Sequence, residues 1–189
     1  MEYINIKNNL GFIQSEDKIY QKSELLLQFE NFIKDSGYRV KKWVNKKKAP
    51  YELLLVDENE KMVHLIMYLK NITGAGWSEK PNIKRTQVSN IRIVSPDNYV
   101  GTSKSETMLI LGYYNFDNNP IMVAWDAYRY IKHKTMRSCY ITVDVLKKGY
   151  QSGYFVTNAS SQKVWIFKSN YFEKFIKDYI EYNSNNEGD

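Results

Sequence analysis

The chain has 189 residues, of which 43% are hydrophobic and 25% charged, proportions that are typical of a folded globular protein and exclude extensive disorder. This length is enough for one hydrophobic core and short for two, so we expect one domain over residues 1–182 and a polar tail over residues 183–189. The net charge of +6 favours a polyanionic partner such as DNA, RNA or an anionic membrane surface.

The expected compartment follows from the cysteine content and the N-terminal sequence. The one cysteine, Cys139, excludes an intramolecular disulfide and a cysteine-based zinc site. The first residues show no basic segment followed by an apolar run, and no stretch approaches the roughly 20 apolar residues that span a bilayer. We therefore expect a cytoplasmic protein without a membrane partner.

The first element in the chain is a predicted helix over residues 18–36, where apolar residues recur at helical spacing. Ser15 is its expected N-cap, and Gly37 is expected to stop it. A second amphipathic helix is predicted over residues 170–182. Together with the strands, the pattern predicts an α+β fold: a single curved, mainly antiparallel β-sheet flanked by an N-terminal and a C-terminal helix. The strands are predicted at residues 38–44, 51–56, 62–69, 85–94, 108–114, 121–125, 140–143, 154–156 and 164–167.

Side chains that could carry out chemistry are few. The chain has two histidines, His64 and His133, and lacks both a GxSxG nucleophile elbow and a GxxxxGK[ST] phosphate loop. Cys139 lies in an apolar run and is interpreted as a buried small residue, and His64 lies inside a strand pattern and is interpreted as structural. The main hypothesis therefore has no catalytic residue, no metal and no cofactor.

A divergent magnesium-dependent endonuclease is the first alternative. The common nuclease core needs an acidic residue at one strand end and an acid-x-Lys triplet on the next strand, so that two carboxylates hold Mg²⁺ and the lysine activates water. Glu52, Asp57 and Lys70 lie in the predicted hairpin, but the residue two positions before Lys70 is Tyr68. The motif is therefore absent or degraded, and these three residues with Mg²⁺ are the catalytic candidates of this alternative only.

Positive charge is gathered in three segments that lie close to aromatic residues. Residues 41–48 hold five lysines around Trp43, residues 80–87 follow Trp77, and residues 129–137 follow Trp125. Basic side chains neutralise phosphates and an exposed ring can stack on a base, so this pairing suits nucleic acid. A lysine run in a turn is also typical of a solvated surface, and that interpretation stays open for the first segment.

The second and third segments supply the candidate contacts. Arg85 and Gln87 occupy alternate positions of one predicted strand, so their side chains share a face, and an arginine beside a glutamine can read base edges. The two segments form one interface only if they fold onto a common surface. The candidate nucleic-acid contacts are Lys84, Arg85, Gln87, Arg129, Lys132 and Arg137, with Trp77 and His133 nearby.

A longer pattern within residues 51–182 consists of residues 66–76 (IMYLKNITGAG), 84–88 (KRTQV), 109–114 (LILGYY), 123–129 (VAWDAYR) and 164–167 (VWIF). This pattern is similar to the methylase-associated domains that stand beside DNA methyltransferases, or are fused ahead of endonuclease domains, in bacterial restriction and defence loci. The resemblance implies a DNA-recognition or accessory module, with DNA and a methyltransferase or endonuclease subunit as partners, and it supplies no catalytic residues.

Three hypotheses for the function therefore compete. The first is a DNA-binding or accessory module of a restriction-modification or defence system, without a catalytic motif of its own. The second is the magnesium-dependent endonuclease, and the third is a protein-interaction subunit that does not contact nucleic acid. The first predicts that Arg85, Arg129 and Arg137 converge on one surface, whereas the third predicts that the basic segments scatter over different faces.

Overall fold

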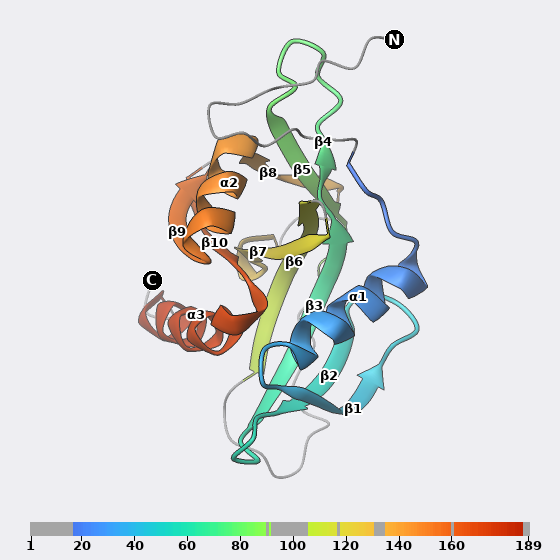
Figure 1. Ribbon diagram of the computed structural model, residues 1–189, viewed down its shortest axis with the longest axis vertical. Helices are drawn as coiled ribbons and strands as arrows, with labels where there is room; N and C mark the ends of the chain where they lie inside the picture. Colours follow the sequence, from blue (N-terminus) through green and yellow to red (C-terminus); the bar gives the residue numbers. More distant parts are fainter. Residues whose placement is uncertain are drawn as a thin grey trace.

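The computed structural model describes residues 17–89, 91, 106–116, 118–130, 135–159 and 161–186 (Figure 1). Its largest element is a seven-stranded sheet in which every neighbouring pair is antiparallel except the parallel third and fourth strands. The strands, in their order across the sheet, are β1 (Arg39–Asn45), β2 (Tyr51–Val56), β3 (Met62–Asn71), β6 (Glu106–Phe116), β7 (Asn119–Asp126), β10 (Gln162–Phe167) and β9 (Tyr154–Ala159). This confirms the predicted α+β fold with a large, mainly antiparallel sheet.

The described helices and a second sheet surround the large one. The second sheet is antiparallel and has three strands, β4 (Thr73–Gly74), β5 (Ile83–Val88) and β8 (Arg137–Thr142). The α-helices are α1 (Lys22–Lys34), α2 (Val143–Ser152) and α3 (Phe172–Asn186), and the short 3₁₀ helices are η2 (Tyr128–Tyr130) and η3 (Ser169–Tyr171).

The large sheet is buried on both faces. Helices α1 and α3 cover one face and pack on side chains such as Leu65, Leu109 and Trp165. Helix α2 and the three-stranded sheet, called the small sheet below, cover the other face, where Ile110 and Trp125 lie. Because both faces are covered, the sequences of the central strands are continuous apolar runs and do not alternate between apolar and polar residues. Figure 1 shows α1 lying across β3, and the small sheet at one end of the large one.

The two terminal helices differ in extent from the prediction. Helix α1 has Gln21 as its N-cap, with the Glu24 carboxylate accepting a hydrogen bond from the Gln21 N–H at 2.9 Å, so the predicted cap is wrong. Ser15 itself lies outside the described residues. Helix α3 continues to Asn186, so residues 183–186 of the predicted tail are helical. No helix in the described part of the chain is long and apolar enough to cross a membrane.

The sequence predicted one sheet and two helices, whereas the structure has a second, small sheet and the additional helix α2. The strand predicted at residues 140–143 ends at Thr142, whose hydroxyl accepts a hydrogen bond from the Val145 N–H and caps α2. Two of the positions that α2 buries are Lys147 and Gly149, so its sequence lacks a continuous apolar stripe. Strand β5 covers Ile83–Val88, whereas the strand was predicted over residues 85–94, of which residues 90 and 92–94 lie outside the described part of the chain.

Candidate nucleic-acid interface

The small sheet has one face toward the core and one away from it. Lys84, Thr86 and Val88 alternate with Arg85 and Gln87 along β5, and the first three are buried. The outer face therefore carries Arg85 and Gln87. Their cross-strand partners on β8 are Tyr140 and Ser138, which lie on the same outer face.

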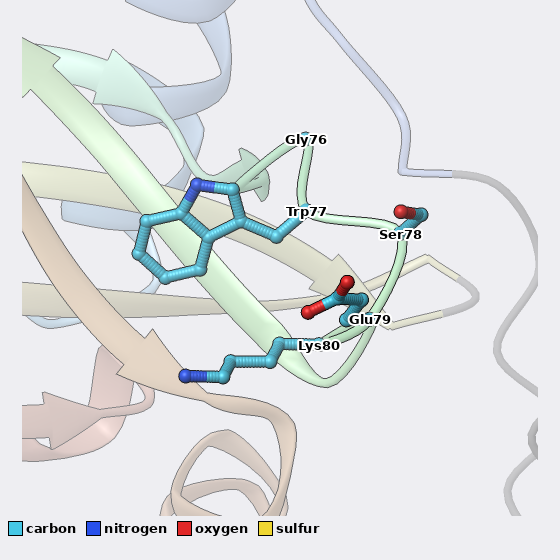
Figure 2. A pocket seen from close by; sticks show the side chains of 5 residues that line it. All are labelled: Gly76, Trp77, Ser78, Glu79 and Lys80. Atoms are coloured by element: carbon cyan, nitrogen blue, oxygen red, sulfur yellow. The ribbon is translucent and has the colours of Figure 1, made fainter.

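A loop between β4 and β5 adds an exposed aromatic ring to this face. Trp77 is 44% exposed, and its indole stacks on Tyr140 with ring centroids 5.2 Å apart and an interplanar angle of 28°. Gly76 precedes it with a φ of +79°, a conformation that favours glycine. Figure 2 shows the indole extending from the loop over the sheet. The backbone turn at Gly76 thus places the Trp77 indole against Tyr140.

The same loop encloses an open hollow of about 420 Å³. In Figure 2 the Lys80 side chain extends to the same side of the loop as the Trp77 indole. An aromatic ring, a carboxylate and an ammonium group therefore belong to the lining of one hollow. Among the described residues, those that line the hollow are Gly76, Trp77, Ser78, Glu79 and Lys80.

Lys84 has a structural partner rather than an exposed position. It is only 8% exposed, and its Nζ lies 2.7 Å from both carboxylate oxygens of Asp17. Asp17 also accepts hydrogen bonds from the Gly74 N–H at 2.8 Å and the Tyr114 hydroxyl at 3.0 Å. These contacts join the segment before α1 to the β4–β5 hairpin that carries Trp77. The Lys84 ammonium is therefore paired inside the protein and does not face a ligand.

The third basic segment does not join the face that carries Arg85. Arg137 pairs with Val88 at the start of β8, and strand alternation puts it on the opposite face of the small sheet from Tyr140. The Arg129 guanidinium donates a hydrogen bond to the Ser161 carbonyl at 2.6 Å, which anchors it to the β9–β10 turn of the large sheet. The expected convergence of Arg85, Arg129 and Arg137 is therefore not what the fold produces. Lys132 and His133 lie outside the described residues.

Side chains of the first basic segment, residues 41–48, make contacts within the protein. The Glu30 carboxylate oxygen accepts hydrogen bonds from Lys46 Nζ at 2.7 Å and from the Trp43 indole N–H at 2.8 Å. The Lys46 ammonium also lies 5.0 Å from the Trp43 ring centroid. Lys41 and Lys42 lie along β1, an edge strand, where positive charge discourages pairing with another sheet.

The nuclease candidates are held apart by the β2–β3 hairpin. Glu52 lies 2.9 Å from His64 Nε2, and Asp57 Oδ1 accepts hydrogen bonds from the N–H groups of the turn after β2. Val56 pairs with Met62 at that turn, so Lys70 lies eight residues further along β3, roughly 26 Å away. The described residues contain no group of three His, Cys, Asp or Glu side chains that could hold a metal ion. Asp57 and Lys70 therefore cannot act on one reacting atom in this fold.

Sequence reasoning did not find Tyr140 or Glu79. Tyr140 joins the face only because β5 pairs with β8, and no local pattern reveals a pairing between strands so distant in the chain. Glu79 follows Trp77 in a loop whose shape depends on Gly76, and a single acidic residue beside a lysine carries no distinctive signal.

A family model described as Methylase-associated X1 matches residues 63–176, which is more than half of the chain. The chain belongs to the Methylase-associated X1 family. The segment that the Methylase-associated X1 model matches begins in β3 and ends in α3, so it includes the whole small sheet and the loop with Trp77. This membership confirms the resemblance and supports an accessory module of restriction-modification systems. No curated protein and no solved structure matches the chain.

Proposed function

We propose that this protein is the DNA-recognition module of a restriction-modification or defence system, and that it contacts DNA through the outer face of the small sheet. The single observation that carries the proposal is the gathering of Arg85, Gln87 and the Trp77–Tyr140 stack on that face. The family description supports the biological setting, because it associates the chain with methylases.

Each side chain on the face can make a contact of a kind that nucleic-acid binding uses. Arg85 can neutralise a phosphate or donate two hydrogen bonds to one guanine, and Gln87 can pair with adenine. Within the described residues, neither side chain has a hydrogen-bond or ion-pair partner. Both are therefore available to a ligand. The three arginines do not converge, so the expected support from the third basic segment is lost. The proposal depends instead on Arg85, Gln87 and the Trp77–Tyr140 stack, and Lys84, Arg129 and Arg137 are not part of the contact.

The direct test is a DNA titration followed by fluorescence anisotropy, at salt concentrations from about 50 to about 300 mM. We expect binding that weakens steeply as salt rises, because phosphate contacts release counterions. The double variant Arg85→Gln/Gln87→Ala should bind more weakly, whereas Lys42→Gln on β1 should bind like the unmodified protein. A protein that binds neither duplex nor single-stranded DNA at the lowest salt would refute the proposal.

A protein-interaction subunit is the second candidate function, and β9 is the observation that favours it. This edge strand of the large sheet carries no charged side chain, whereas the opposite edge, β1, carries Arg39, Lys41 and Lys42. An uncharged edge can accept a strand from a partner such as a methyltransferase or endonuclease subunit.

Two sets of variants separate the candidates. Asn158→Pro removes a backbone donor from β9 and should abolish capture of a methyltransferase from the same locus while DNA binding persists. The Arg85→Gln/Gln87→Ala variant should show the reverse pattern. Capture that survives Asn158→Pro would remove β9 from consideration.

A further inference from the structure

The Trp77 indole has one covered and one open side. Tyr140 stacks on it at 5.2 Å, and yet the residue keeps 44% of its surface exposed. The exposed ring borders a hollow of about 420 Å³, so a ligand in the hollow would lie against the indole. The stack on Tyr140 fixes the ring plane, so a ligand would meet a rigid aromatic platform.

The shape of that platform favours an unpaired base over a base pair. Inside a duplex both faces of a base are covered by its neighbours, and a protein reaches only the base edges in the grooves. An aromatic side chain gains stacking energy from a base whose face is exposed. The hollow lies toward the small end of the range of about 300–1,000 Å³ that ligand pockets occupy, which suits one nucleotide.

The polar groups at the hollow define which nucleotide would fit. Glu79 lines it, and its carboxylate can only accept hydrogen bonds when ionised. Cytosine N4 and adenine N6 are amino donors, whereas thymine presents a carbonyl oxygen at the equivalent position. Lys80 lines the same hollow and supplies a positive charge for the phosphate of the bound nucleotide.

We propose that the hollow beside Trp77 binds one unpaired base that carries an exocyclic amino group, stacked on the open face of the indole. This inference rests on the proposed DNA binding and adds the class of ligand. Arg85 and Gln87, on the same face of the small sheet, contact the nucleic acid that flanks the unpaired base. Trp77 is the stacking residue, Glu79 the residue that selects the base, and Lys80 a phosphate contact.

The test compares three oligonucleotides of one sequence: a matched duplex, the same duplex with one unpaired cytosine, and the single strand. We expect the unpaired cytosine and the single strand to bind about tenfold more tightly than the matched duplex. Trp77→Ala should reduce this preference to within about twofold, and Trp77→Phe should retain most of it because a ring remains. Near-ultraviolet circular dichroism would show that each variant is folded.

Base selection has its own matched comparison. Replacing the unpaired cytosine by thymine should weaken binding to the unmodified protein several-fold, and Glu79→Gln should shrink that difference. The inference is overturned if DNA binds but the matched duplex binds as tightly as the unpaired substrates, or if Trp77→Ala leaves the preference intact. An absence of all DNA binding would instead overturn the proposed function together with this inference.

Discussion

The Lys84 ammonium lies 2.7 Å from both carboxylate oxygens of Asp17, and both side chains are largely buried. Asp17 precedes α1 and Lys84 lies on β5, so the pair joins the N-terminal part of the described chain to the small sheet. The hydrogen bonds that Asp17 accepts from Gly74 and Tyr114 complete its partners on β4 and β6. The position of the loop with Trp77 depends on this cluster, because Gly74 is the last residue of β4.

Replacing Lys84 with methionine should lower the free energy of unfolding by about 2–4 kcal/mol, because the substitution leaves the Asp17 carboxylate buried without its cation. Urea unfolding followed by circular dichroism measures the change. Lys80→Met is the matched control at an exposed position, where we expect a change within about 0.5 kcal/mol. A loss below about 1 kcal/mol at Lys84 would mean that water replaces the ammonium at Asp17.

Arg85→Gln should reduce the slope of log K against log salt by about 0.7–0.9, because one phosphate contact is lost. The slope is obtained by repeating the DNA titration at several salt concentrations. Arg39→Gln removes the same charge from β1, where Arg39 forms an exposed ion pair with Glu60, and should leave the slope unchanged. Equal effects of the two variants would indicate a response to net charge and not a contact at Arg85.

The Cys139 thiol should be almost inert in the folded protein. Burial raises its pKa to about 12, although a hydrogen bond with Tyr130 acts in the opposite direction. An unfolded cysteine has a pKa of about 8.5, so the folded protein keeps a proton that the unfolded chain loses. The stability contributed by this group is therefore complete below about pH 8.5 and declines as the pH rises toward 12.

A thiol-reactive chromophore at pH 8 gives the measurement for Cys139. We expect the native protein to react at least about 100-fold more slowly than the protein in concentrated guanidinium chloride, because the thiolate is the reacting form. The Cys139→Ala variant, which should not react in either condition, controls for other groups. Rapid reaction of the native protein would show that the β8 core opens readily.

The large sheet could be predicted because its signal is local. Strand β2 was predicted with its observed bounds, and β6 and β7 were found from continuous apolar runs that only burial on both faces explains. Helix α2 was missed because it packs through a glycine and buries a lysine. The small sheet was missed because Thr86 pairs with Cys139 across 53 positions of sequence, a contact that no local pattern encodes.

In the candidate site, too, the features with a local sequence signal were predicted, and those that depend on tertiary contacts were not. Arg85 and Gln87 share a face because they lie two positions apart on one strand, and this spacing can be seen in the sequence. Lys84 was grouped with them by proximity in the chain, but the same alternation turns it inward toward Asp17. The separation of Arg137 from Arg85 depends on the β5–β8 register, and register follows from tertiary packing rather than from the composition of either strand.

Gly149→Ala in α2 should destabilise the protein even though alanine is the better helix former. Helix propensity alone predicts a gain of about 1 kcal/mol. A Cβ at position 149 would lie 2.6 Å from Ile166 Cβ, however, so α2 would have to move away from β10. Overpacking of this kind costs about 1–3 kcal/mol, and we expect a net loss of stability in urea unfolding.

A double-variant cycle identifies the cause of that loss. Ile166→Ala removes the Cγ2 atom that would be nearest to the new methyl group, so Gly149→Ala should destabilise less in the Ile166→Ala background than alone. Lys148→Ala, at the adjacent exposed position, should change stability by less than about 0.5 kcal/mol. If Gly149→Ala instead raises stability, the close packing of α2 against Ile166 on β10 would be contradicted.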